Sequence, residues 1–295
     1  MKKSSNAAAT AISYCFCLTA CTGKKDGTED TEKIFRTWSS DGEKPPKTRF
    51  IPKEASLPDG AKPWGGTVSH HLLTDALIHD WFTELAEARK IKTFYILSPS
   101  HWGLSLYDFS LTNGSWQTKD GLVHSEKDKA EHLSRLFDVP FDDKVFVYEH
   151  GVSTLIPYIK KYFPDAKVVA IAYYGEPPVN MNLATKLYEK VTKVFSIKDN
   201  DSFLLISSDF SHKSDIEKTA EKDAKSRYFL TSLKPSAWTL GICDNRPAMY
   251  LLSKLFTEKT QCTIQRNTNA YKLSDETDPE DITSYFFTYF WEKED

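Results

Sequence analysis

The chain has 295 residues, of which 40% are hydrophobic and 13% aromatic, so it is long and apolar enough to bury a sizeable core. Its formal net charge is −3 at pH 7, and it has no basic cluster interleaved with aromatic residues, which argues against nucleic acid as a partner. It also has no run of about 18 apolar residues, which argues against a transmembrane helix.

The N-terminus has the pattern of a secretory signal. Two lysines precede a modestly apolar run at 7–20, and the sequence Leu-Thr-Ala-Cys at 18–21 is similar to a bacterial lipobox. Small residues fit the groove of a signal peptidase, and the thiol of Cys21 would carry the lipid. We therefore expect 1–21 to be a lipoprotein signal, and the exported protein to meet the membrane through this lipid anchor only. The alternative is a cytoplasmic protein whose N-terminal cysteines are incidental.

A single folded domain is expected after a polar segment. Residues 22–33 are rich in Gly, Lys, Asp and Glu and carry no core-forming side chains, so we expect 22–60 to form a flexible tether. Neither an internal repeat nor a linker interrupts the rest of the chain. We therefore predict one domain over 61–295.

Short apolar runs alternate with amphipathic stretches from Gly66 onward, which predicts repeated strand–helix units. The expected strands are 67–70, 92–97, 144–148, 167–173, 203–206, 262–272 and 284–291, and a hairpin is expected within 106–118. The expected helices are 75–89, 126–136, 152–163, 181–195, 216–230 and 246–256. The predicted fold class is α/β, with a central, mostly parallel mixed sheet flanked by helices.

Three expected strands end in side chains that can bind a metal ion. The first ends at His70 and His71, the second is followed by His101, and another is followed by Asp209 and His212. Ligands of open α/β sheets bind beyond the carboxyl ends of the strands, so these side chains predict one shared site. Neighbouring strand residues point to opposite faces, so at most one of His70 and His71 is expected to enter it. Taken singly, each histidine could instead lie on the surface, and Asp209 could cap a helix.

Two further segments carry candidate groups. Glu149 and His150 precede a helix and could supply a base, a metal ligand or a partner of a ligand, or they could only stabilise the helix N-terminus. Cys243 also precedes a helix, where a thiolate is favoured. A buried structural cysteine is the alternative, and a disulfide with Cys262 is another.

Five segments together resemble the Memo-like family, also called AmmeMemoRadiSam system protein B. They are GTVSHHLL, ILSPSHWG, VYEHGVSTLIP, ISSDFSH and LGICDNRP, which occur in this order between Gly66 and Pro247. The resemblance implies a fold similar to that of class III extradiol dioxygenases. In those enzymes two histidines and a carboxylate hold non-haem Fe(II).

The Memo-like family keeps the two histidines and has a cysteine in place of the carboxylate. Carried over by motif, the resemblance implies that the metal ligands are His70, His101 and Cys243. It also implies that the catalytic groups lining the pocket are His150, Asp209 and His212, where Asp209 would orient His212 for proton transfer. Such a ligand set suits Fe(II) or Cu, and Zn would also fit.

The expected function is therefore that of a metal-binding redox protein, a non-haem metal-dependent oxidoreductase acting on a small or aromatic substrate. The alternative is a non-catalytic lipoprotein that uses the same pocket to bind a metal ion or a peptide. One departure favours this alternative: three residues after His150 the family commonly has a second glutamate, and this chain has Ser153.

Overall fold

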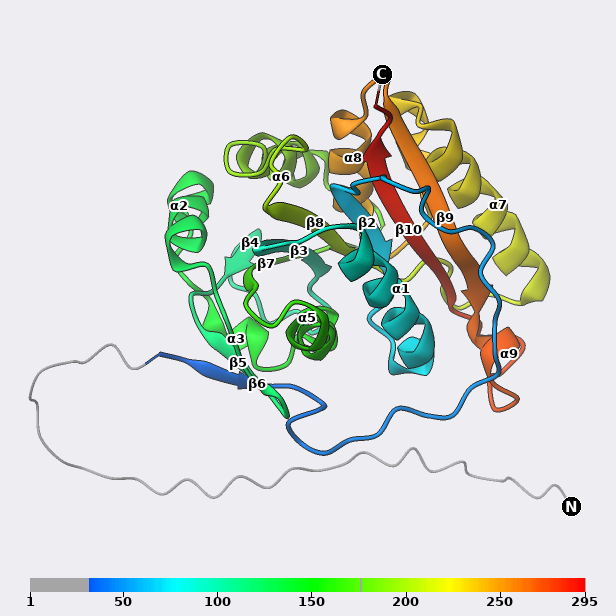
Figure 1. Cartoon of the computed structure of the whole chain (residues 1–295), viewed down its shortest axis with the longest axis horizontal. Helices are drawn as coiled ribbons and strands as arrows, with labels where there is room; N and C mark the ends of the chain where they lie inside the picture. The colour runs from blue at the N-terminus through cyan, green and yellow to red at the C-terminus, as the bar shows by residue number, and fades with distance from the viewer. Residues whose placement is uncertain (1–31, 176, 295) are drawn as a thin grey trace, which may run out of the picture. The chain divides into compact units, whose positions relative to one another are not determined.

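The computed structural model of the chain describes residues 32–175 and 177–294 (Figure 1). The lipoprotein signal expected at 1–21, with Cys21, lies outside the described residues. Among the helices that are described, none is both long enough and apolar enough to cross a membrane. The described residues contain one seven-stranded sheet and one three-stranded sheet.

The larger sheet has a parallel centre with antiparallel strands on both sides. In spatial order its strands are β4 (Phe109–Leu111), β7 (Lys167–Tyr173), β3 (Thr93–Pro99), β8 (Ser202–Ser207), β2 (Gly65–Val68), β10 (Ser284–Glu292) and β9 (Thr260–Asn269). The pairs of β7 with β3, β3 with β8 and β8 with β2 are parallel. The pairs involving β4, β10 and β9 are antiparallel. The predicted mixed α/β sheet is confirmed.

Helices cover both faces of this sheet, which explains why its central strands are apolar almost throughout. On β3, Phe94 and Ile96 belong to one buried cluster, whereas Tyr95 and Leu97 belong to the other. One face is covered by α1 (Asp75–Ala88) and α5 (Ile156–Tyr162) (Figure 1). The opposite face is covered by α2 (Lys127–Phe137), α6 (Met181–Val191), α7 (Ile216–Ser232) and α8 (Arg246–Leu255). The shorter helices are η1 (Leu72–Thr74), α3 (Asp143–Phe146), α4 (His150–Ser153), η2 (Pro235–Leu240) and α9 (Ala270–Leu273).

The smaller sheet contains a strand from the segment expected to be a tether. It consists of β1 (Ile34–Arg36), β5 (Ser115–Thr118) and β6 (Gly121–His124), with β1 parallel to β5. Further along the segment, the Arg49 N–H donates to the carbonyl of Leu273 at 2.9 Å, and the Glu54 N–H donates to that of Gln265 at 2.8 Å. Backbone hydrogen bonds thus join the described residues 32–60 to the sheet and to α9.

One predicted strand is wrong. Residues 144–148 were expected to be extended, but they include most of α3 and the turn that follows it. The adjacent residues Val145 and Phe146 are both buried, and Phe146 packs against Phe35 and Trp116. A short apolar run does not distinguish a strand from a buried helical turn, because both bury neighbouring side chains.

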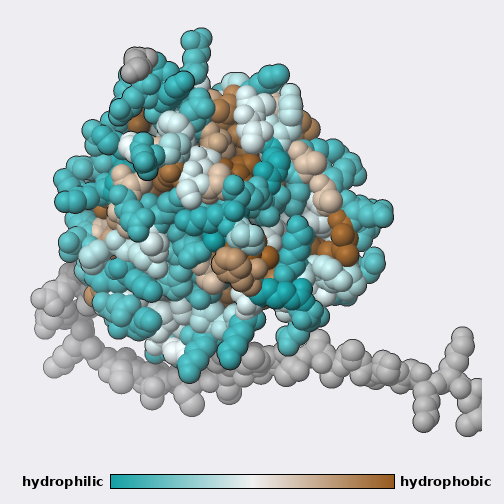
Figure 2. Space-filling model, turned by 45° about the vertical axis from the view of Figure 1, so that its right-hand side comes forward, coloured by the Kyte–Doolittle hydropathy of each residue, from teal (hydrophilic) through white to brown (hydrophobic). Residues whose placement is uncertain are grey.

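The surface carries no marked division into polar and apolar halves in the view of Figure 2. Polar residues cover most of this face, and apolar residues occur on it in small groups. Such scattered apolar residues are usual on soluble domains. The chemistry of the chain is concentrated instead at one edge of the larger sheet.

Candidate metal centre

The three strand ends singled out in the sequence lie next to one another. Strands β2, β8 and β3 are neighbours in the sheet and run in the same direction, so their carboxyl ends share one edge. His70 follows β2, His101 follows β3, and Asp209 and His212 follow β8. The predicted convergence of these segments is confirmed, and the site lies where ligands of open α/β sheets bind.

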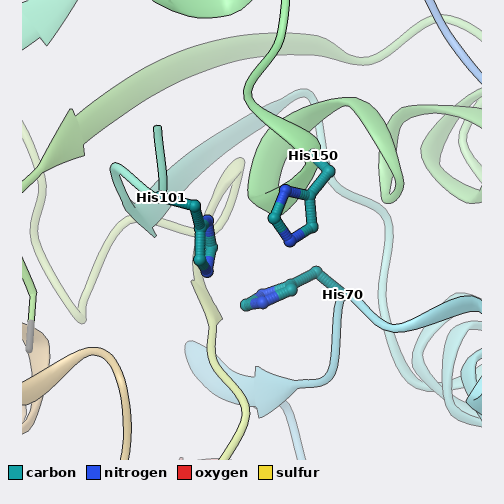
Figure 3. Close-up of side chains that lie close together, drawn as sticks. All are labelled: His70, His101 and His150. Carbon is teal, nitrogen blue, oxygen red and sulfur yellow. The ribbon is translucent and has the colours of Figure 1, made fainter. Parts of the chain in front are cut away.

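Three imidazoles gather at this edge. One ligand atom from each of His70, His101 and His150 lies within 4.8 Å of the others. Their rings point toward one another from three separate segments (Figure 3). The ring centroids of His101 and His150 are 4.1 Å apart, and those of His70 and His101 are 4.8 Å apart. Imidazole nitrogens are common ligands of Zn, Cu and Fe, so this cluster could hold such an ion.

His101 is oriented by Glu149, the residue that caps the N-terminus of α4. Oε1 of Glu149 is 2.6 Å from Nδ1 of His101, and Oε2 accepts the backbone N–H of His101 at 2.8 Å. Oε1 also accepts the N–H of Gly151 at 2.8 Å. Burial alone would raise the pKa of Glu149, but its hydrogen bonds with His101 lower it below its usual range. The ionised carboxylate therefore accepts a hydrogen bond from Nδ1–H, and Nε2 of His101 faces the cluster.

His70 is oriented by a serine at the end of β8. Nδ1 of His70 is 2.9 Å from Oγ of Ser207, and Ser207 donates its hydroxyl to the carbonyl of Gly151 at 2.5 Å. A hydroxyl has a single proton to donate, so Ser207 must accept a hydrogen bond from Nδ1 of His70. The unprotonated nitrogen of His70 is then Nε2, which faces the other histidines.

His150 is uncharged at neutral pH. Burial, together with the neighbouring His70 and His101, lowers the pKa of His150 to about 3. Among the described residues its buried Nδ1 has no hydrogen-bond partner. A neutral imidazole with a vacant nitrogen can bind a metal ion.

A carboxylate that the sequence analysis did not single out lies in the centre of the site. Oδ2 of Asp244 is 3.4 Å from Nε2 of His70, 3.6 Å from Nε2 of His101 and 3.7 Å from Nε2 of His212. Burial would raise the pKa of Asp244, but the imidazoles of His101 and His212 hold it below its usual range. The available signal was its place in the segment LGICDNRP, directly after Cys243.

Asp209 and His212, which were also predicted to line the pocket, lie beside the gathered imidazoles. Oδ2 of Asp209 lies 3.9 Å from Nε2 of His70, and the side chain is buried. His212 reaches the site through the approach of its Nε2 to Asp244. His71 does not join the histidine cluster, because its Nδ1 lies 2.7 Å from the hydroxyl of Tyr285. Only one of the adjacent pair His70 and His71 enters the cluster, as predicted.

Cys243 is close to the site in sequence but is not among the gathered ligand atoms. Its side chain is 4% exposed and belongs to the apolar cluster beneath α8. Burial, together with the nearby charge of Asp244, raises the pKa of the Cys243 thiol to about 12. Cys243 and Cys262 are both free cysteines, so they do not form the disulfide considered above. The assignment of Cys243 as a metal ligand stays a prediction.

A cavity of about 720 Å³ opens beside the histidines. His70 and His150 line its inner part, and Lys44, Lys47 and Glu276 also border it. Its volume lies in the range of small-molecule sites. The two lysines come from the segment 32–60, so this segment forms part of the cavity wall.

The residues present fit a metal ion. The cluster offers several imidazole nitrogens, two of them oriented by hydrogen bonds at Nδ1. It also contains a buried carboxylate oxygen, Oδ2 of Asp244, that has no hydrogen-bond partner among the described residues. Buried charges are normally paired or coordinate metals, so a cation at this position would satisfy the site.

Comparisons with known proteins agree with this architecture. A family model described as Memo-like protein matches residues 75–263. A MEMO1 family protein from Caldivirga maquilingensis is 25% identical over 196 residues, which are 64% of this chain and 65% of that protein. A second, from Pyrobaculum aerophilum, is 26% identical over 60% of this chain and 63% of its own length. A third, from Pyrobaculum arsenaticum, is 29% identical over 66% of this chain and 68% of its own length. The match covers slightly less than two thirds of the length of the first two relatives and about two thirds of the third.

Proposed function

The chain belongs to the Memo-like protein family, and from this premise we propose that it binds a metal ion at the carboxyl edge of β2, β8 and β3 and acts there as a redox protein. The observation that carries the proposal is the approach of the ligand atoms of His70, His101 and His150 to within 4.8 Å of one another. His70 and His101 also belong to the ligand set implied by the family resemblance. The third ligand differs, because the geometry offers His150 and the resemblance implies Cys243.

The proposed activity is that of a non-haem metal-dependent oxidoreductase acting on a small or aromatic substrate. When bound, iron or copper would supply electron-transfer chemistry, whereas zinc would only polarise a ligand. The chain itself provides a cavity of about 720 Å³ for the substrate. His150, kept neutral at pH 7 by burial and by its histidine neighbours, could bind the ion or hydrogen-bond a bound substrate. Asp209 approaches His70 and His212 approaches Asp244, and these two residues are the candidates for proton transfer.

Metal analysis of the full-length protein tests the proposal. The protein is purified under anaerobic conditions, supplied separately with Fe(II), Cu and Zn, desalted, and analysed for bound metal. We expect one ion per chain for wild type and loss of that ion in His101→Ala. His132→Ala, which removes an exposed imidazole on α2, serves as the matched control and should retain the ion. Retention by His101→Ala, or absence of metal in wild type, would contradict the proposed metal site.

A non-catalytic binding protein is the second candidate function. Ser153, at the position where the family commonly has a second glutamate, favours it, since one acid/base group is missing. Measuring O₂ consumption by the iron-loaded protein with catechol as a probe distinguishes the candidates. Turnover above that of His101→Ala would reject the binding protein, and stoichiometric iron without turnover on this probe would favour it.

A further inference from the structure

The carboxylate of Asp244 is fixed in one orientation at the centre of the site. Oδ1 accepts hydrogen bonds from the Ser208 hydroxyl at 2.9 Å and from the Asp209 backbone N–H at 3.1 Å. Oδ2 has no hydrogen-bond partner among the described residues, although the side chain is only 3% exposed. One carboxylate oxygen thus anchors the group, and the other is presented to the imidazoles.

The backbone that carries Asp244 is also held in place. The Asn245 side-chain amide donates to the carbonyls of Leu97 at 3.0 Å and Ser207 at 2.9 Å, and its oxygen accepts the Tyr173 hydroxyl at 2.7 Å. These three residues lie at the carboxyl ends of β3, β8 and β7. Asn245 therefore attaches the loop to the strand ends that also position the histidines.

The distances from Oδ2 match those between ligands of one metal ion. Nε2 of His70, His101 and His212 lies 3.4, 3.6 and 3.7 Å from it, respectively. Charge-assisted hydrogen bonds between nitrogen and oxygen are shorter, about 2.7–2.9 Å. In a tetrahedral site with metal–ligand bonds of about 2.1 Å, neighbouring ligand atoms are about 3.4 Å apart. The spacing leaves room for an ion between the carboxylate and the imidazoles.

The hydrogen bonds of the histidines support the same arrangement. Nδ1 of His70 donates to Ser207, and Nδ1 of His101 lies against Glu149. In both rings Nδ1 is engaged by a hydrogen-bond partner, so the nitrogen that faces Asp244 is Nε2. The ring nitrogens that could bind an ion and the carboxylate oxygen Oδ2 therefore face the same space.

Building on the proposed metal centre, we propose that Asp244, rather than the adjacent Cys243, supplies the anionic ligand beside the imidazoles of His70, His101 and His150. Cys243 packs instead among apolar residues of the core. A nitrogen and oxygen ligand set favours Fe(II), Mn(II) or Zn(II), whereas a thiolate would favour Cu(I). The proposal therefore narrows the metal preference of this chain.

Cobalt substitution of the full-length protein separates the two ligands. Thiolate ligation to Co(II) produces an intense near-ultraviolet charge-transfer band, and carboxylate ligation does not. We expect wild type to bind Co(II) without this band, and Cys243→Ser to keep both the spectrum and the affinity within about 3-fold. Asp244→Asn should weaken Co(II) binding by at least about 100-fold, the upper end of the effect of losing an outer hydrogen-bonding partner. Asp165→Asn, an exposed aspartate in the turn before β7, is the matched control and should bind as wild type does.

Three other outcomes would contradict the proposal, and each would reject a different part of it. A thiolate band in wild type that Cys243→Ser abolishes would make Cys243 the ligand and leave the metal centre itself intact. Wild-type affinity in Asp244→Asn would reject the carboxylate. Failure of wild type to bind Co(II), Fe(II) or Zn(II) would reject the metal centre and the ligand together. The spectra of wild type and Cys243→Ser decide the ligand even if Asp244→Asn does not fold.

Discussion

Glu149 holds His101 by two hydrogen bonds, one from the imidazole Nδ1 at 2.6 Å and one from the backbone N–H at 2.8 Å. The two residues are far apart in sequence, and the contact fixes both the rotation of the ring and the nitrogen that faces the site. Carboxylates commonly orient metal-binding histidines in this way. Because of this contact, His101, which lies in a loop, has a fixed orientation and is a candidate metal ligand.

We expect Glu149→Gln to weaken metal binding by about 10- to 100-fold with little loss of secondary structure. The amide can present a donor to Nδ1, which favours the ring form with its proton at Nε2, the nitrogen required by the ion. Titration with Co(II) or Zn(II) against a competing chelator measures the change. Glu131→Gln, which alters an exposed glutamate on α2, should bind as wild type does. Equal affinities of Glu149→Gln and wild type would show that Glu149 does not orient a ligand.

Asn245→Ala is expected to destabilise the metal-free protein by roughly 2–4 kcal/mol, because it leaves buried backbone carbonyls and the Tyr173 hydroxyl without their partner. Chemical denaturation at pH 7 measures the free energy of unfolding. Asn182→Ala, at an exposed position on α6, is the control and should change it by less than about 0.5 kcal/mol. If Asn245→Ala lowered the free energy of unfolding no more than the control does, Asn245 would not stabilise the fold by joining the three strand ends.

Glu84 on α1 predicts a pH dependence of stability away from the site. Burial would raise the pKa of Glu84, but hydrogen bonds from Gln265, the Leu57 N–H and Lys53 lower it below the model-peptide value of 4.5. A carboxyl whose pKa is lower in the folded state stabilises the fold fully above its unfolded pKa, and this contribution is lost as pH falls through the folded pKa.

Glu84→Gln should therefore be less stable than wild type at pH 7 by about 1–3 kcal/mol, and the difference should decrease as pH falls below about 4.5. Denaturant unfolding at several pH values between 3 and 7 tests this expectation. The exposed Glu87 on the same helix provides the control variant Glu87→Gln. A difference that stays constant over the whole range would rule out ionisation of Glu84 as its source.

The two described cysteines are expected to be reduced and to react slowly. Cys243 is buried, and burial raises the pKa of its thiol to about 12, so the reactive thiolate is scarce at pH 8. Alkylation of unreduced native protein, followed by mass spectrometry of its peptides, should leave Cys243 unmodified. Unfolding without a reductant should then allow complete modification of Cys243 and Cys262. A 243–262 disulfide-linked peptide would contradict the free thiols of the structure.

Local patterns sufficed to predict much of the fold. The strand expected at 167–173 coincides with β7, and the helix expected from Asp75 begins at that residue. Both elements have strong apolar patterns, periodic in the helix and continuous in the strand, and such patterns can be recognised from neighbouring residues alone. The run 144–148 is also apolar, but it is too short to distinguish a strand from a helical turn, and Phe146 packs there against Phe35 and Trp116, which are distant in sequence.

The sequence by itself determined where the chemistry lies, because histidines and acids placed after parallel strands must share one edge of the sheet. Only the tertiary structure decided how these groups face one another. The orientation of His70 depends on Ser207, 137 residues away, and that of His101 on Glu149, 48 residues away. The proposed preference for Asp244 over Cys243 as the anionic ligand likewise depends on tertiary structure. Adjacent side chains can point into the core or into the site, and Asn245, with hydrogen bonds to three strand ends, holds the loop that presents Asp244 to the histidines.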